Sequence, residues 1–178
     1  MRTIIFAAAT TALLAFASFG ADAPQAPAEG TAAPKFSLQN QDAATVSLDQ
    51  LKGKWVILYF YPKDFTSGCT LEAHNFQRDL AKYEQKNAVI LGVSLDPVDS
   101  HKSFCTKEGL NFKLLADTDH AVTTTYGSLT NYQGTPYASR NTFLIDPSGV
   151  IRKVYLKVKP ATHSADLLAD LDTLQAKK

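Results

Sequence analysis

The chain contains 178 residues, of which 45% are hydrophobic and 20% are charged. This composition is typical of one compact globular domain and excludes a disordered or fibrous protein. Lysine and arginine number 18, aspartate and glutamate number 17, and the formal net charge is +1. Because neither sign forms a run, we expect no nucleic-acid partner and no binding to an anionic membrane surface.

The N-terminal segment differs from the rest of the chain. Arg2 precedes an apolar run from Ile4 to Phe19, which small residues follow. This order is typical of a secretory signal peptide, and the run is shorter than the roughly 20 residues that a membrane-spanning helix needs. We therefore predict a signal peptide over approximately residues 1–23, with a membrane anchor as the weaker alternative, and a flexible leader over residues 24–33. The mature protein is then exported, with a bacterial periplasm as the expected compartment and no membrane association.

The mature chain begins with patterns typical of strands. Two short runs, Lys35–Gln39 and Thr45–Leu48, flank a polar stretch and predict a hairpin, after which a helical turn ends at Gly53. The run from Trp55 to Tyr61 is continuously apolar or aromatic. Such a run predicts a central strand that is covered on both faces.

The remainder of the chain alternates strands with helices. Helices are predicted from about Cys69 to Lys86, from Ser100 to Glu108 and from about Thr162 to Ala176, and strands at Ala88–Ser94, Lys113–Leu115, Thr142–Ile145 and Val150–Val158. The last two strands are joined by a turn containing Pro147 and Gly149, which predicts an antiparallel pair. We expect one α/β domain over residues 34–178, with a mixed central sheet flanked by helices and the N-terminal β-hairpin as an extension.

The chain has two cysteines, Cys69 and Cys105. This number excludes a disulfide-dense scaffold, and their spacing fits neither a zinc finger nor a C-x-x-C motif. In an exported domain they could still form one structural disulfide. His101 and Cys105 lie four positions apart on one predicted helix, where His74 or Cys69 could complete a metal site, but no metal-binding motif accompanies them. The glycines form no phosphate-binding loop. We therefore predict neither a metal nor a cofactor.

Cys69 occupies a position where a thiol is expected to be reactive. It follows a buried strand and a polar loop and starts a predicted helix, whose free N–H groups and dipole favour a thiolate. Bringing an ordinary thiol pKa of about 8.5 down to about 6 takes roughly 3.4 kcal/mol, whereas the dipole supplies at most about 2 kcal/mol. A nucleophilic Cys69 therefore needs a nearby positive group, most simply a guanidinium. The alternative is a small buried core residue, which its polar flank disfavours.

The segment from Tyr59 to Phe76 (YFYPKDFTSGCTLEAHNF) closely resembles the active-site segment of peroxiredoxins, specifically of the bacterioferritin-comigratory or peroxiredoxin Q type. Pro62, Thr66 and Cys69 match its P-x-x-x-T-x-x-C spacing. The segment that starts at Arg140 (RNTFLID) resembles the strand on which that family carries its active-site arginine. The resemblance covers most of the mature chain. It implies a thioredoxin-like fold and a thiol peroxidase.

The resemblance also implies a role for each of these residues. Cys69 attacks one oxygen of hydrogen peroxide or an organic hydroperoxide and becomes a sulfenic acid. Arg140, together with backbone N–H groups near the thiol, stabilises the thiolate and the charge that develops on the leaving oxygen. Thr66 hydrogen-bonds the peroxide, and Pro62 shields the thiolate from water. No metal, haem or flavin takes part.

The second cysteine departs from one known arrangement of this family. Many members have a resolving cysteine five residues after the first, where this chain has His74. Another arrangement places it on the next helix, and Cys105 resembles that arrangement. A Cys69–Cys105 disulfide is then implied, and we predict that the helix start around Cys69 unwinds, because a disulfide needs Cα atoms within about 7 Å. If Cys105 stays remote, an external thiol resolves Cys69.

The implied electron donor in either case is a thioredoxin-like protein, and we expect a monomer or weak dimer. Two other interpretations stay open at this point. A thiol-disulfide oxidoreductase would share the fold, but the C-x-x-C motif is missing. A non-catalytic copper-binding or redox-sensing thioredoxin-like protein would use Cys69, Cys105 and His101 as ligands.

Overall fold

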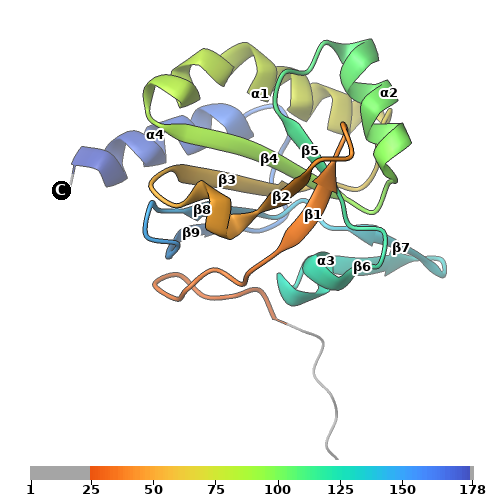
Figure 1. Cartoon of the computed structure of the whole chain (residues 1–178), viewed down its shortest axis with the longest axis horizontal. Coiled ribbons are helices and arrows are strands. Elements are labelled where there is room, and N and C mark those ends of the chain that lie inside the picture. Colours follow the sequence, from red (N-terminus) through yellow and green to blue (C-terminus); the bar gives the residue numbers. More distant parts are fainter. Residues whose placement is uncertain (1–24, 177–178) are drawn as a thin grey trace, which may run out of the picture.

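Residues 25–176 are described by the structure, a computed structural model in which helices cover a central β-sheet (Figure 1). The strands are β1 (Ser37–Asn40), β2 (Thr45–Ser47), β3 (Trp55–Phe60), β4 (Ala88–Ser94), β5 (Lys113–Ala116), β6 (Leu129–Tyr132), β7 (Thr135–Ala138), β8 (Thr142–Ile145) and β9 (Ile151–Tyr155). The helices are α1 (Ser67–Gln85), α2 (Val98–Glu108), α3 (Ala121–Thr125) and α4 (His163–Ala176), and a 3-10 turn, η1, spans Leu48–Leu51. The predicted signal peptide lies outside the described residues.

The main sheet has seven strands in the order β2-β1-β5-β4-β3-β8-β9. Strands β3, β4 and β5 run parallel, whereas β8 is antiparallel to β3 and to β9, and β1 is antiparallel to β5 and β2. The mixed α/β sheet that the sequence predicts is confirmed. The β1–β2 hairpin extends it beyond β5, and the antiparallel pairing of the last two strands is also as predicted.

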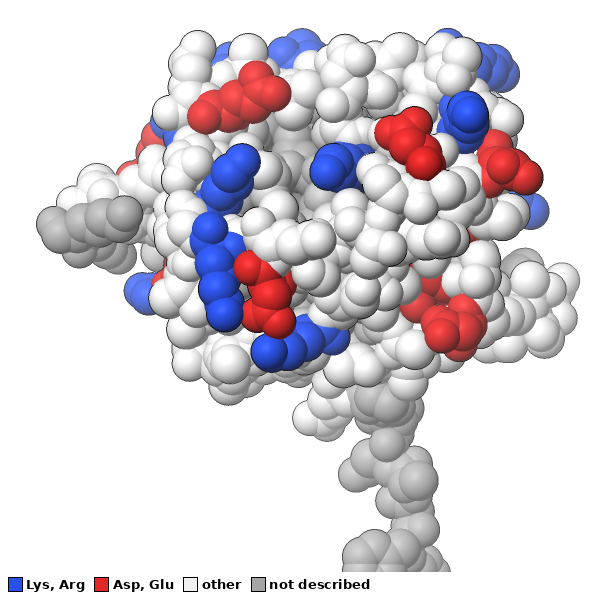
Figure 2. Space-filling view, in the orientation of Figure 1, with Lys and Arg blue, Asp and Glu red and all other residues white. Residues whose placement is uncertain are grey.

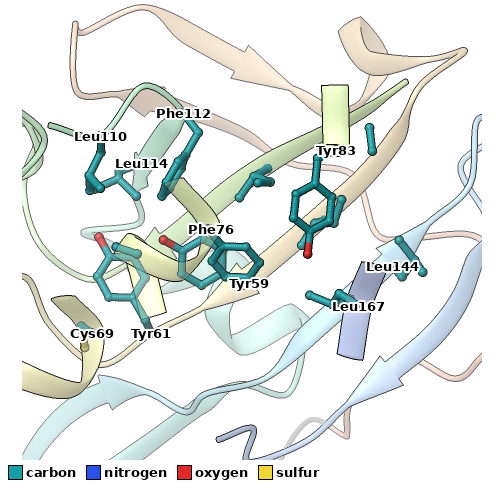
Figure 3. Close-up of a cluster of buried hydrophobic side chains, with 14 of the residues drawn as sticks. Tyr59, Tyr61, Cys69, Phe76, Tyr83, Leu110, Phe112, Leu114, Leu144 and Leu167 are labelled. Atoms are coloured by element: carbon teal, nitrogen blue, oxygen red, sulfur yellow. The ribbon is translucent and has the colours of Figure 1, made fainter. Parts of the chain in front are cut away.

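Every residue of β3 is buried, because the two faces of this strand pack against different groups of side chains. Trp55, Ile57 and Tyr59 contribute to a cluster that α1, α2 and α4 cover, including Phe76 and Leu167 (Figure 3). The intervening residues of β3 pack on the opposite face against α3 and the segments around β1 and β7. The period of two along a strand explains this division, and the central strand is covered on both faces as predicted.

Two elements were not predicted from the sequence, the short helix α3 and the hairpin β6–β7. The hairpin turns at Gln133 and Gly134, which both have positive φ, 49° and 85°. Its strands are mostly exposed and include Pro136, so they lack the alternating apolar pattern by which a strand is recognised. Helix α1 starts at Ser67, two residues before the predicted start at Cys69.

The predicted flexible leader requires a correction over its last residues. The backbone N–H of Gly30 donates to Ile151 O at 2.8 Å, and that of Ala33 donates to Gly149 O at 2.9 Å. The Glu29 carboxylate accepts from Val154 N–H at 2.9 Å. These hydrogen bonds hold the segment against β9, whose outer edge would otherwise have unpaired backbone groups.

Both signs of charge are interspersed over the face shown in Figure 2. In the described part of the chain, no helix is both long enough and apolar enough to cross a membrane.

Candidate active site

Cys69 lies in the first turn of α1, directly after the loop that leaves β3 (Figure 3). Its side chain is buried, with 2% of the residue exposed, in the cluster that also contains Tyr61 and Ala73. The N-cap residue, Thr66, is extended, and the first N–H groups of a helix have no intrahelical carbonyl partner. These amides and the positive end of the helix dipole stabilise negative charge on the sulfur.

Arg140 supplies the positive group that a nucleophilic Cys69 needs. It lies between β7 and β8, far from Cys69 in the chain, yet its Nη2 donates to Cys69 Sγ at 3.2 Å. A Cβ atom added at Gly68 would lie only 2.8 Å from the same Nη2, so glycine leaves the room that the guanidinium occupies. The sequence-predicted pair of Cys69 and Arg140 is therefore brought together by the fold, and its charge favours the thiolate.

Glu72 holds the guanidinium from the other side. Arg140 Nη1 donates to Glu72 Oε2 at 2.6 Å, and Glu72 is only 1% exposed. Burial raises the pKa of Glu72 to about 7, although the ion pair with Arg140 opposes this shift. Its second oxygen, Oε1, is buried without a hydrogen-bond partner. Glu72 was not among the predicted site residues, although its position three residues after Cys69 places both on one side of the helix.

The predicted substrate-contacting residues, Pro62 and Thr66, lie in the loop between β3 and α1. Thr66 Oγ1 donates to Lys63 O at 3.0 Å rather than capping the helix, so its oxygen lone pairs remain available to a donor such as a hydroperoxide. Pro62 is partly buried at the start of the same loop. The contacts proposed for these two residues with substrate stay predictions.

Phe65 gives this loop an unusual backbone. Its φ of 62° lies in the left-handed region, which bulky side chains rarely adopt. The Phe65 ring packs edge-on against Phe104 of α2, with the centroids 5.1 Å apart, and Lys107 Nζ lies 5.4 Å from the same ring. The loop before Cys69 is thereby tied to the helix that carries the second cysteine.

Cys105 lies in α2 and is 7% exposed, in the same buried cluster as Cys69. Both cysteines are free thiols in this structure. Burial, and to a smaller extent the carboxylates of Asp64 and Asp42, raises the pKa of Cys105 to about 12. A surface pocket of about 340 Å³, lined by residues including Asp42 and Lys102, reaches Cys105 from the side of the β1–β2 turn.

The histidines considered as metal ligands have other partners. His101 is fully buried, with Nδ1 2.9 Å from Asp64 Oδ2, and His74 Nε2 lies 3.0 Å from Glu108 Oε2. Between residues 25 and 176, no group of three or more His, Cys, Asp or Glu side chains is placed to hold a metal ion.

A thiol at a helix N-terminus, beside a guanidinium on a mixed sheet of thioredoxin type, defines a class of protein, the thiol-dependent oxidoreductases of the thioredoxin fold. The family described as AhpC/TSA matches residues 30–154. The chain belongs to this family.

Similar proteins and solved structures show which kind of member of this family the chain resembles. "Putative peroxiredoxin bcp" of Coxiella burnetii is 45% identical over 146 residues, which cover 80% of this chain and 97% of that protein. "Peroxiredoxin Bcp" of Bacillus subtilis is 39% identical over 152 residues, which cover 83% of this chain and 97% of that protein. The solved structure of Xanthomonas campestris peroxiredoxin Q aligns with a TM-score of 0.73 and 37% identity, and the alignment covers 78% of this chain and 90% of that chain. The resemblance, the thioredoxin-like fold and the thiol peroxidase activity predicted from the sequence are confirmed.

Proposed function

We propose that this peroxidase uses two cysteines, with Cys69 reducing the hydroperoxide and Cys105 resolving the product. The observation that carries the first role is the 3.2 Å contact between Arg140 Nη2 and Cys69 Sγ at the start of α1. A positive group and unpaired amides around one sulfur favour the thiolate, which is the nucleophilic form of a cysteine.

In the first step, the Cys69 thiolate attacks one oxygen of the hydroperoxide. An S–O bond forms, the O–O bond breaks, and the leaving oxygen departs with the electron pair and takes up a proton to become water or an alcohol. Arg140 and the first-turn amides stabilise the charge on that oxygen, and Thr66 orients the peroxide. Cys69 ends as a sulfenic acid.

In the second step, the Cys105 thiol attacks this sulfenic acid. A disulfide forms between the two sulfurs, and the hydroxyl leaves as water with the thiol proton. Two observations support this role. Cys105 belongs to the same buried cluster as Cys69. Two solved structures of the Xanthomonas campestris relative are cysteine-to-serine variants, and the replaced cysteines have the same separation in sequence as Cys69 and Cys105.

In this proposal the two cysteines, which are buried on separate helices and not bonded to each other in this structure, pair after a local movement. The first turn of α1 is the segment that unwinds in this proposal. It has fewer backbone hydrogen bonds than the body of the helix, since the amides at its start have no intrahelical partner.

Organic hydroperoxides are proposed as substrates alongside hydrogen peroxide. Phe65 and Leu71, on either side of Cys69 in sequence, are each 46% exposed and give the surface of this segment an apolar character. Another solved structure concerns the alkyl peroxide reduction activity of the Xanthomonas campestris bacterioferritin comigratory protein.

The proposed electron donor is a thioredoxin-like protein in the compartment to which the chain is exported. The apolar segment from Ile4 to Phe19 supports export, with a bacterial periplasm as the proposed location. A monomer or weak dimer stays a prediction.

A coupled assay with thioredoxin, its reductase and NADPH tests this function. We expect turnover with hydrogen peroxide and with cumene hydroperoxide, none with Cys69→Ser, and a block after one oxidation with Cys105→Ser. Full thioredoxin-dependent turnover by Cys105→Ser would overturn the resolving role. Detection of unprocessed protein only in the cytoplasmic fraction of the source cell would overturn the proposed export.

A further inference from the structure

A buried carboxylate–imidazole pair joins the loop before Cys69 to the helix that carries Cys105. Asp64 is 3% exposed and His101 is fully buried. His101 Nδ1 lies 2.9 Å from Asp64 Oδ2, and the other ring nitrogen, Nε2, is buried without a partner. Neither of the two chemical steps proposed above uses Asp64 or His101.

The Asp64 side chain accepts hydrogen bonds from several donors at once. Tyr61 donates its hydroxyl to Oδ1 at 2.7 Å, and Ser100 donates to Oδ2, also at 2.7 Å. Although burial opposes ionisation, the hydrogen bonds from His101, Ser100 and Tyr61 lower the pKa of Asp64 below its ordinary value. The carboxylate is therefore ionised, so the imidazole Nδ1–H is the donor in the contact with it.

The backbone of the loop between β3 and α1 is also hydrogen-bonded close to the start of α2. The N–H of Asp64 donates to Asp96 Oδ2 at 2.9 Å, just before α2 begins. The next residue, Phe65, packs on Phe104 of α2. The loop between β3 and α1 thus contacts the start of α2 through charge-assisted hydrogen bonds and an aromatic contact.

These contacts lie close in sequence to both sulfurs. Asp64 is five residues before Cys69, and His101 is four residues before Cys105, one helical turn away on α2. Asp64 lies in the loop that enters the first turn of α1, so unwinding of that turn that also displaces the loop, or a displacement of the start of α2, would strain or break the pair. The same contacts that keep the reduced loop in place therefore oppose formation of the disulfide.

We propose that Asp64 and His101 are positioning residues that hold the loop before Cys69 against α2, and that separation of this pair controls how fast Cys105 captures oxidised Cys69. The inference rests on the two-cysteine function proposed above. It concerns a competition between two reactions of the Cys69 sulfenic acid. Attack by Cys105 gives the disulfide and water, whereas a second hydroperoxide gives sulfinic acid and one more molecule of water or alcohol. The more slowly Asp64 and His101 separate, the larger is the fraction of Cys69 that is oxidised to sulfinic acid.

The test compares His101→Leu with His101→Asn in the full protein. Leucine removes the donor to Asp64, whereas asparagine offers an N–H at the position of Nδ1. Rapid-mixing experiments follow the first oxidation and the disulfide step through the fluorescence of Trp55, the single tryptophan. Mass spectrometry then measures the fraction of Cys69 converted to sulfinic acid at a fixed peroxide concentration.

For His101→Leu we expect disulfide formation to become about tenfold faster and the sulfinic fraction about tenfold smaller, the change that loss of one hydrogen bond to a charged group produces. The rate constant of the first oxidation should stay within about threefold. His101→Asn should restore both quantities to within about threefold of the wild-type values.

His163→Leu is the matched control. His163 is also buried, at 2% exposed, but its Nε2 hydrogen-bonds Thr142 Oγ1 at 2.8 Å, and it lies at the start of α4. This variant should lose thermal stability without a change in the ratio of disulfide to sulfinic acid. If His101→Leu behaves in the same way, the pair is structural only and the inference is overturned. If His101→Leu does not fold, Ser100→Ala removes a single donor to Asp64, and disulfide formation should become about threefold faster.

Failure of the proposed function gives a different result. If the wild-type protein forms no Cys69–Cys105 disulfide at all, the two-cysteine function fails, and this inference fails with it. If the wild type forms the disulfide but neither the His101 variants nor Ser100→Ala change its rate relative to the first oxidation, only the inference fails.

Discussion

The two cysteines are both buried in one cluster, yet groups of opposite charge lie near their sulfurs. Cys69 starts a helix, and its sulfur accepts a hydrogen bond from the Arg140 guanidinium. Cys105 lies in the second half of α2, near the carboxylates of Asp64 and Asp42, where burial raises its pKa to about 12. Burial alone therefore does not distinguish the two thiols, whereas the charges and dipoles that face each sulfur do.

In the proposed two-cysteine function, this difference also accounts for the order of the two steps. A thiol that stays protonated is protected from peroxide, because the thiolate is the nucleophile. In that proposal, Cys105 therefore stays reduced until Cys69 has become a sulfenic acid. Substitutions that remove these differences one by one should have effects that range from a complete loss of activity to a change in stability alone.

Replacing the nucleophile should have the largest effect. We expect Cys69→Ser to reduce the rate of peroxide consumption by at least about a thousandfold, because a hydroxyl at this position is not ionised at neutral pH. A peroxide-consumption assay on the reduced protein measures this. Residual activity within tenfold of wild type would mean that another group carries the reaction.

Removing the guanidinium should have the next largest effect. Arg140→Met should lower kcat/KM for hydrogen peroxide by about 10²- to 10³-fold, the usual loss when a group that stabilises a developing oxyanion is deleted. Arg140→Lys, which keeps the charge but not the planar fork to Glu72 and Cys69, should fall between this variant and wild type. Equal rates for all three proteins would contradict the role of Arg140.

Removing the second thiol should separate the two steps. Cys105→Ser should keep the rate of the first oxidation within about threefold of wild type, because Cys105 makes no contact that activates Cys69. Its steady-state turnover with a thioredoxin-like reductant should fall by at least about tenfold. Stopped-flow and steady-state measurements on the same preparation check both expectations, and a first oxidation slowed as much as turnover would contradict them.

The last effect leaves the chemical steps aside and is a pH dependence of stability on the Cys69 side of the site. The pKa of Glu72 is raised from an ordinary 4.5 to about 7 in the folded protein. The contribution of protonated Glu72 to the free energy of unfolding is therefore present at low pH and is lost as the pH rises through 7. Relative to Glu72→Gln, wild type should lose about 2 to 3 kcal/mol of unfolding free energy between pH 5 and pH 8. Urea denaturation at both pH values measures this difference, and parallel pH curves would contradict the assignment.

Much of the fold could be predicted because its patterns are local. The continuous apolar run from Trp55 to Tyr61 predicts β3, and the proline–glycine turn predicts the β8–β9 pair. The β6–β7 hairpin was missed because its strands are exposed and its register depends on a turn with positive φ at Gln133 and Gly134. The prediction of a flexible segment around Gly30 was wrong, because its hydrogen bonds go to β9, far away in the sequence.

The site residues also divide into those that a local motif predicts and those that depend on contacts between distant segments. Cys69, Thr66 and Pro62 lie within one short motif, and the need for a guanidinium, together with the family resemblance, pointed to Arg140. Glu72 and the Asp64–His101 pair could not be assigned from the sequence, because their roles depend on burial and on contacts between separate elements.

The measurement that tests the account most directly is oxidation of the reduced protein by one equivalent of hydrogen peroxide, followed by counting of free thiols and disulfide mapping by mass spectrometry. Cys69→Ser and Cys105→Ser serve as parallel samples. The account predicts rapid loss of both thiols and a Cys69–Cys105 link in wild type, no rapid loss in Cys69→Ser, and a sulfenic acid at Cys69 in Cys105→Ser. Slow oxidation of both cysteines to a similar extent, without that link, would contradict it.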